Sequence, residues 1–231
     1  MDARASLLTC MAQNAVLGLL NPADREHLAR LARRRDLSRG EVLCHQGYVW
    51  PRVALLVQGT GQWCLLSPSG RRQVVFRMGP SDVVWGHSLF DHEPLPASFE
   101  MVTDGYVYWW TQEDIVPVLS KHVDAVWALS REMVRWMRRV REVLYSLAFQ
   151  SVAHRVARLL LDYYPECEGR PVPRDLTLEE MADMVGTSPE FVCRVLKRLA
   201  HEGILRVGRR YFVFLDRQRL AALAQEDGRV G

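Results

Sequence analysis

Two short helical patterns joined by a glycine constrain the fold of this chain more than any other feature of its sequence. Thr177 is followed three residues later by Glu180, which is the spacing of a capping box that begins a helix. Gly186 then supplies a tight turn, and Ser188 and Pro189 suit the N-cap and first helical positions of a second helix. The sequence therefore predicts a helix-turn-helix, a unit that places its second helix in the major groove of DNA.

The second helix is expected to have one apolar and one polar face. Its apolar residues at helical spacing are Val192, Val195, Leu196 and Leu199, and its polar face carries Glu190, Cys193, Arg194, Lys197, Arg198 and His201. An arginine here can pair with guanine through two hydrogen bonds, and a glutamate can accept from the amino group of cytosine. We therefore expect Arg194 and Glu190 to contact bases, and Lys197 and Arg198 to contact phosphates.

A basic hairpin is expected to follow this helix. Residues 205–214 predict two short strands around the basic turn Gly208-Arg209-Arg210. Between Arg194 and Arg219 eight basic residues stand against two acidic ones, whereas the net charge of the whole chain is only +3. Such a local excess can neutralise phosphates and release counterions. The predicted DNA-binding residues are Thr187, Ser188, Glu190, Cys193, Arg194, Lys197, Arg198, Arg209 and Arg210.

The first half of the chain has the pattern of a β-domain. Short apolar stretches alternate with turn residues between Leu37 and Trp110, which indicates an antiparallel barrel or sandwich. These stretches are 42–44, 53–57, 63–66, 74–76, 83–85 and 107–110. Before them, residues 22–35 predict a short amphipathic helix with Asn21 as N-cap. Residues 166–174 are polar and rich in proline and glycine, so a loop is expected there.

A long helical pattern runs from about Gln112 to Tyr164. Within it apolar residues recur every 3.5 residues for more than three heptads, at Val123, Val126, Ser130, Met133, Met137, Val140, Leu144 and Leu147. A repeat sustained over this length favours a two-stranded coiled coil, and the alternative is a core helix of a monomer. We expect a homodimer whose interface includes Val126, Met133, Met137, Val140, Leu144 and Leu147. Trp127, Trp136 and Tyr145 lie off this repeat and are expected to pack on the β-domain.

Composition excludes several other classes. No apolar run approaches the roughly 20 residues of a membrane span, and the first residues do not resemble a secretory signal. We expect a cytoplasmic protein with no membrane partner. The five cysteines are scattered without a C-x-x-C pair, which argues against disulfides, zinc and iron–sulfur clusters. We predict no catalytic residue and no metal ligand, and we interpret all the cysteines except Cys193 as small buried apolar residues.

Residues 178–196 closely resemble the helix-turn-helix of the CRP/FNR superfamily of bacterial transcription regulators, and the likeness covers nearly the whole chain. Stretches similar to the landmarks of that family's barrel and of the hinge after its dimer helix are 45–47, 57–59, 69–71, 81–84, 102–104 and 147–149. The resemblance implies an α+β fold with an N-terminal antiparallel β-barrel of jelly-roll, cyclic-nucleotide-binding-like type. The implied boundaries are 1–120 for this sensory barrel with its N-terminal helix, 121–148 for the dimerisation helix and 149–231 for a winged helix-turn-helix.

The resemblance also implies a function. A regulator of this type is a homodimer that binds a palindromic promoter site, contacts RNA polymerase and acts as an activator. Glu190 and Arg194 match the family's two base-contacting positions, which implies a G:C pair followed by A:T in each half-site. Where one branch of the family has a further base-contacting arginine this chain has Pro189, and where another has serine it has Cys193. The outer half-site bases are therefore left open.

The resemblance does not identify an effector. The branch that binds cyclic AMP holds the phosphate with a glutamate and an arginine–serine pair, and Gly86, Leu95 and Pro96 stand at those positions. The threonine and serine that meet adenine in that branch are replaced by Val140 and Arg141. Without the arginine the cyclic phosphate has no charged partner, so the sequence disfavours cyclic AMP as the effector. The N-terminal cysteine cluster of the iron–sulfur branch is also missing.

Four alternatives remain open at this point. His87 falls where a carbon-monoxide-sensing branch has an axial haem ligand, so a haem-dependent gas or redox sensor is one alternative, and a structural histidine is the plainer one. Cys193 on the DNA-facing helix is a candidate redox brake, because oxidation there would add bulk or charge, or simply a tolerated thiol. A barrel metalloenzyme using His87, His92 and Glu93 would lack a second, downstream histidine motif. A ligand-binding module with a vestigial DNA domain is the last reading.

Overall fold

The computed structural model describes residues 3–164 and 168–225. The chain divides into two compact units, the first made of residues 1–68 and 75–139 and the second of residues 69–74 and 140–231. We describe each unit by itself.

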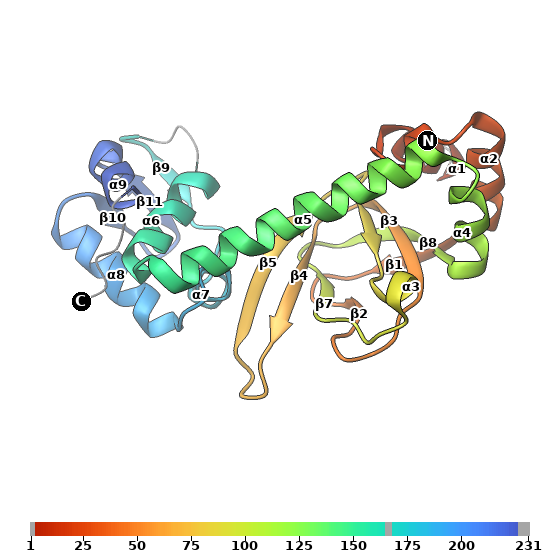
Figure 1. Cartoon of the computed structure of the whole chain (residues 1–231). Helices are drawn as coiled ribbons and strands as arrows, with labels where there is room; N and C mark the ends of the chain where they lie inside the picture. Colours follow the sequence, from red (N-terminus) through yellow and green to blue (C-terminus); the bar gives the residue numbers. More distant parts are fainter. Residues whose placement is uncertain (1–2, 165–167, 226–231) are drawn as a thin grey trace. The chain divides into compact units, whose positions relative to one another are not determined.

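Two four-stranded antiparallel sheets form the β-domain of the first unit, with strand orders β1-β8-β3-β6 and β2-β7-β4-β5 (Figure 1). The strands are β1 (Arg33–Leu37), β2 (Val42–Cys44), β3 (Arg52–Gln58), β4 (Gly61–Leu66), β5 (Arg72–Met78), β6 (Val83–Trp85), β7 (Ser98–Met101) and β8 (Gly105–Thr111). Every apolar stretch expected to be a strand lies within one, and the predicted antiparallel barrel is confirmed. Strand β1 lies at the edge of its sheet and pairs only with β8.

Both faces of the inner strands are covered, which explains their continuous apolar runs. In β3, Ala54 and Leu56 belong to the core between the sheets, whereas Val53 and Leu55 belong to a second core formed with helices. The helices before α5 are α1 (Ala3–Gln13), the short 3-10 helix η1 (Leu17–Leu19), α2 (Pro22–Leu31), α3 (Ser88–Asp91) and α4 (Gln112–Leu119). Figure 1 shows α1, α2 and α4 gathered beside the start of α5 (Val123–Phe149).

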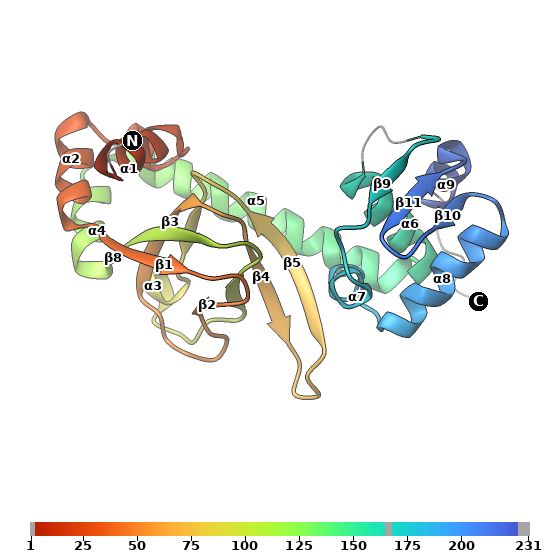
Figure 2. The same ribbon diagram turned by 180° about the vertical axis from the view of Figure 1, so that it is seen from behind.

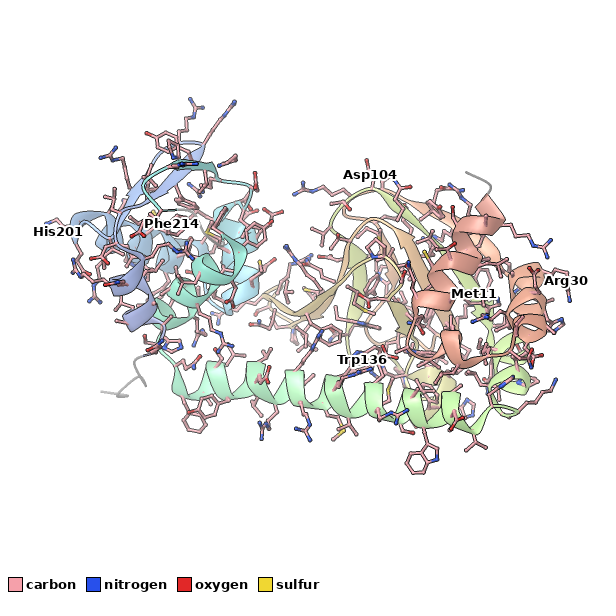
Figure 3. The ribbon with its side chains drawn as sticks, turned by 90° about the horizontal axis from the view of Figure 1, so that it is seen from above. Met11, Arg30, Asp104, Trp136, His201 and Phe214 are labelled. Atoms are coloured by element: carbon pink, nitrogen blue, oxygen red, sulfur yellow. The ribbon has the colours of Figure 1, made fainter. Side chains whose placement is uncertain are left out.

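The helix core and the sheet are joined by a buried hydrogen bond. The indole Nε1 of Trp110 on β8 donates to the carbonyl oxygen of Leu28 on α2 at 2.8 Å. Met11, labelled in Figure 3, is fully buried in the same core. Helix α2 begins as expected, because the Asn21 side chain accepts from the backbone N–H of Asp24.

Several expected boundaries are wrong. The helix expected over 22–35 ends at Leu31, and residues 33–37 form β1 instead. The continuous pattern over 112–164 comprises three helices, α4, α5 and α6 (Val152–Tyr163), and α6 begins at a new N-cap, Ser151. The loop expected over 166–174 contains β9 (Pro171–Pro173). Helix α1, strand β7 and the short helix α3 were not expected from the sequence.

The second unit contains the expected helix pair and its hairpin. Its further elements are α7 (Leu178–Val185), α8 (Pro189–His201), β10 (Leu205–Val207), β11 (Tyr211–Phe214) and α9 (Arg217–Leu223). Figure 2 shows the three-stranded sheet, whose order is β10-β11-β9, beside α6 and α8. Phe212 and Phe214 are fully buried and pack with the apolar faces of α6, α7 and α8. Packing on this core fixes the position of α8, and the opposite face of the helix is exposed to solvent.

Candidate nucleic-acid interface

The turn between α7 and α8 is built by local hydrogen bonds that the sequence predicts. The backbone N–H of Glu180 donates to Thr177 Oγ1 at 3.1 Å, and the N–H of Thr177 donates to Glu180 Oε2 at 2.8 Å, so the capping box is confirmed. Gly186 ends α7 in the left-handed region, at φ 70° and ψ 54°. The N–H groups of Gly186 and Thr187 both donate to the carbonyl oxygen of Ala182. This turn fixes where α8 begins.

Ser188 occupies the N-cap position of α8 with extended backbone, as expected, but its side chain makes no capping hydrogen bond. Hydrogen bonding from the Ser188 side chain and from the backbone N–H of Glu190, with a smaller contribution from the charge of Arg194, lowers the pKa of the Glu190 carboxyl. The expected side-chain cap is therefore wrong. The effect of the serine is to keep Glu190 ionised, which is the form that accepts hydrogen bonds.

Helix α8 has the two faces that its sequence predicts. Val192, Leu196 and Leu199 are buried, and Val195 packs partly buried against the same core. The exposed residues of the first three turns are Glu190, Phe191, Arg194, Lys197 and Arg198, and Cys193 is partly exposed. His201, labelled in Figure 3, is exposed at the last turn. The charged side chains of α8 are thus exposed to solvent, while its apolar side chains pack in the core.

The central arginine of this face has a partner that we did not expect. The guanidinium carbon of Arg194 lies 3.9 Å from the centroid of the Phe191 ring, within the range of a cation–π contact. Phe191 is 47% exposed, on the same side of the helix as Arg194. An aromatic residue three positions before an arginine expected to contact a base was the signal in the sequence that could have indicated this contact.

The other expected DNA contacts occupy different surroundings. Arg198 Nε donates to Glu202 Oε1 at 2.7 Å, and this bond lowers the pKa of Glu202. Lys197 is exposed one position earlier, and Thr187 lies partly exposed in the turn. The helix therefore carries three exposed cations, Arg194, Lys197 and Arg198, and Arg198 is paired with Glu202.

The hairpin expected as a wing is present. Leu205 of β10 pairs with Phe214 of β11, and the backbone N–H of Gly208 donates to the Tyr211 carbonyl oxygen at 2.9 Å across the turn. Arg209 and Arg210 lie exposed in that turn. The hairpin adds two cations to the surface of the second unit.

A partly buried guanidinium connects the helix ends in this unit. Arg155 on α6 donates through Nε to the carbonyl oxygen of Val185 at 2.7 Å, and through one Nη to that of Gln150 at 2.7 Å. Weaker bonds reach the carbonyl oxygens of Ser146 at 3.2 Å and Gly186 at 3.4 Å. Burial lowers the pKa of Arg155, although an arginine at this depth remains charged. One side chain thus satisfies the carbonyl ends of both α5 and α7.

Helix α5 carries a row of exposed apolar side chains at the expected spacing. Their exposed fractions lie between 40% and 71%, and they include Val123, Val126, Met137, Val140, Leu144 and Leu147. Met133 differs, because it packs partly buried against the core of the first unit. Trp136 packs on the β-domain as expected, with its ring centroid 5.7 Å from that of Phe76 (Figure 3). Trp127 does not, since it is 64% exposed, whereas Tyr145 belongs to the second unit, where its ring centroid lies 5.1 Å from that of Phe149.

Two barrel positions at which the resemblance implies charged groups for a cyclic phosphate carry none. A side chain at Gly86 would clash, because its Cβ would lie 2.3 Å from the Trp50 carbonyl oxygen. Leu95 is 1% exposed and belongs to the core between the sheets. The positions at which the resemblance implies an effector-binding glutamate and arginine are therefore a crowded glycine and a buried leucine.

His87 lies among aromatic side chains. Its ring centroid is 5.6 Å from that of Trp63 and 6.4 Å from that of Trp136, and burial lowers its pKa. Its buried Nδ1 has no hydrogen-bond partner among the residues that the structure describes. Because two indole rings occupy the space beside the imidazole, the residues present do not fit a haem.

The described residues offer little for other chemistry. Within 3–164 and 168–225 no group of three or more histidine, cysteine or acidic side chains is placed to hold a metal ion, and this includes His92 and Glu93. Cys10, Cys44 and Cys64 are buried, as interpreted from the sequence, whereas Cys167 lies outside the described residues. In the same part of the chain no helix combines the length and apolar character of a membrane span.

Comparison with known proteins identifies the domain family of each unit. Residues 34–122 match the model of the cyclic nucleotide-binding domain, and residues 154–223 match that of the Crp-like helix-turn-helix domain. A CRP-like cAMP-activated global transcriptional regulator of Mycobacterium tuberculosis is 30% identical over 195 residues, which cover 82% of this chain and 87% of the relative. The cyclic AMP receptor protein of Thermus thermophilus is 27% identical over 76% of this chain and 80% of its own length. The fold is also similar to a solved regulator of the crp/fnr family from Eubacterium rectale, with TM-score 0.78, 18% identity, and coverage of 91% of this chain and 98% of that one.

Proposed function

Because the chain belongs to the CRP/FNR family of DNA-binding transcription regulators, we propose that it acts as a homodimer that binds a palindromic promoter site through two copies of α8. The observation that carries this proposal is the exposed face of α8. There Glu190 is ionised and Arg194 is exposed on a helix whose start is fixed by the Gly186 turn. A guanidinium and a carboxylate one helical turn apart can contact successive base edges in the major groove.

The preferred base sequence is determined by selection from a pool of randomised duplex DNA, followed by gel-shift titration of the selected duplex. Arg194→Ala should weaken binding to that duplex by about 1–3 kcal/mol and relax the preference at one base pair of each half-site. Arg30→Ala is the matched control, since Arg30 is an exposed arginine on α2 of the first unit (Figure 3). A wild-type protein that selects no sequence at moderate salt would overturn the proposal.

The exposed apolar row on α5 supports a second copy of the chain as its occupant. Met137 and Leu144 are 71% and 64% exposed, and apolar residues repeated every 3.5 positions are the pattern by which two helices pair. In sedimentation equilibrium the wild-type protein should be a dimer and Leu144→Glu a monomer. Leu19→Glu, at a 46% exposed leucine on η1, should remain dimeric. A monomeric wild type, or a dimeric Leu144→Glu, would contradict this assignment.

The effector is proposed to differ from that of the relatives named for cyclic AMP. The proposal is supported by the crowding around Gly86 and by the burial of Leu95, which leave no charged side chain at these two positions. We further propose that the protein works in the cytoplasm, with RNA polymerase as a partner and activation as its effect. Transcription in vitro from a promoter with the selected site upstream tests this, and reduced transcript would instead indicate a repressor.

A further inference from the structure

The contact between Phe191 and Arg194 points to a role that the charges of α8 alone do not explain. Phe191 is almost half exposed, and the buried face of the same helix is formed by other residues, Val192, Leu196 and Leu199. Exposing a phenyl ring to water is unfavourable. The guanidinium of Arg194 lies over this ring, with its carbon 3.9 Å from the ring centroid.

A guanidinium that stacks on an aromatic ring keeps its hydrogen-bonding capacity. Its five N–H donors lie in the plane of the group, whereas the contact with the ring uses the face. Stacking therefore restricts the rotamers of Arg194 without using the donors that would meet a guanine. An ion pair with Glu190 would have used them, and the charge of Arg194 contributes less than the Ser188 side chain to the lowered pKa of Glu190.

We propose that Phe191 is a positioning residue for sequence recognition: it holds the Arg194 guanidinium in place before DNA arrives. This inference rests on the proposed function, because it deepens the role of Arg194 at the same surface. The contact becomes stronger when DNA excludes water from the ring and the cation. The conformational entropy that the arginine side chain loses on binding also becomes smaller, because part of it is already lost in the free protein.

The test compares two duplexes: the one selected by the wild-type protein, and the same duplex with the guanine that depends on Arg194 replaced in each half-site. The ratio of the two affinities measures specificity. Phe191→Ala and Phe191→Leu should both lower this ratio roughly 3- to 30-fold, the range of a cation–π contact. Phe191→Tyr, which keeps an aromatic face, should retain most of it. Binding to random duplex should be unchanged in all three.

Two further measurements separate positioning from other roles. In an Arg194→Ala background, Phe191→Ala should lower the ratio no further, because the group being positioned is gone. Phe90→Ala, at a 50% exposed phenylalanine on α3, is the matched control and should leave the ratio unchanged. Thermal melting of each variant checks that the fold is intact.

One readout does not depend on DNA. In nuclear magnetic resonance spectra of the free protein, the ring current of Phe191 should shift the side-chain protons of Arg194 upfield, and Phe191→Leu should abolish that shift. If the shift is present but no duplex is selected, the proposed function fails while the contact stands. If Phe191→Leu is as specific as wild type, or if the losses from Phe191→Ala and Arg194→Ala add, the positioning role is refuted.

Discussion

Arg155 provides the sharpest test of how the second unit is held together. Its guanidinium satisfies carbonyl groups at the ends of two helices, with bonds of 2.7 Å to Val185 and to Gln150. Arg155→Met keeps the apolar stem and removes every donor. A hydrogen bond to a charged group contributes about 1.5–3 kcal/mol, and such values are not additive. Because the guanidinium is only partly buried, we expect a loss of about 2–4 kcal/mol for the four bonds together.

The positions of the tryptophans make this loss measurable in one unit at a time. All seven tryptophans lie between Trp50 and Trp136, in residues of the first unit. During urea unfolding, tryptophan fluorescence therefore follows the first unit, while far-ultraviolet circular dichroism follows both. Arg155→Met should move the dichroism transition of the second unit to lower urea and leave the fluorescence midpoint unchanged.

Two further variants, Arg155→Lys and Arg158→Met, test whether the lost stability comes from the hydrogen bonds of the Arg155 guanidinium. Arg155→Lys should lose most of the same stability, because a single ammonium cannot bond carbonyl groups on both helix ends. Arg158→Met is the control, since Arg158 is 61% exposed on the same helix and only 3.8 Å from Asp162 in a weak ion pair. It should change stability by no more than about 0.5 kcal/mol. Equal effects of Arg155→Met and Arg158→Met, or an equal shift in fluorescence, would refute the reasoning.

Two other predictions concern the first unit. Glu132 is buried, and its Oε2 accepts a hydrogen bond from Trp85 Nε1 at 3.2 Å. Burial raises the pKa of Glu132 above the ordinary 4.5. The stability that its protonated form provides is therefore lost as the pH rises through the folded-state pKa. Glu132→Gln, which keeps an acceptor, should melt at a higher temperature than wild type at neutral pH, with a difference that vanishes below pH 4.5; a difference constant with pH would contradict this. Titration calorimetry with cyclic AMP should show no binding tighter than about 1 mM, since Gly86 and Leu95 offer the phosphate no charge, and saturable heat at lower concentration would overturn that view.

Local signals predicted the second unit well because its geometry is determined within a few residues. The capping box of Thr177 and Glu180 and the left-handed turn at Gly186 need only their own segment. Ser188 shows the limit of such reasoning, because its side chain makes no capping hydrogen bond and contributes instead to the lowered pKa of Glu190. Phe191 was missed for a related reason: apolar periodicity assigns aromatic residues to cores, and its partner is a cation on the surface.

The missed elements depend on contacts that are distant in sequence. Strand β1 contains Arg33, Arg34 and Arg35, with Leu37 as its only fully buried residue, so it has no strand-like alternation to detect. It forms because β8 supplies backbone partners along its length, and because Arg34 lies 3.9 Å from the Tyr106 ring centroid and Arg33 lies 5.0 Å from that of Trp109. The division of the 112–164 pattern was more accessible, since Ser151 is an ordinary N-cap three residues before His154.

The arginines of β1 also affect how molecules of this protein meet. An edge strand with unpaired backbone groups can add a strand from another molecule, and repeated addition leads to fibres. Arg33, Arg34 and Arg35 stand on the edge strand of their sheet and are paired with Asp114, Asp36 and Glu41, so a strand added there would have to bury or break these charged pairs. A chain that we propose to pair through α5 is thereby discouraged from polymerising through its sheet.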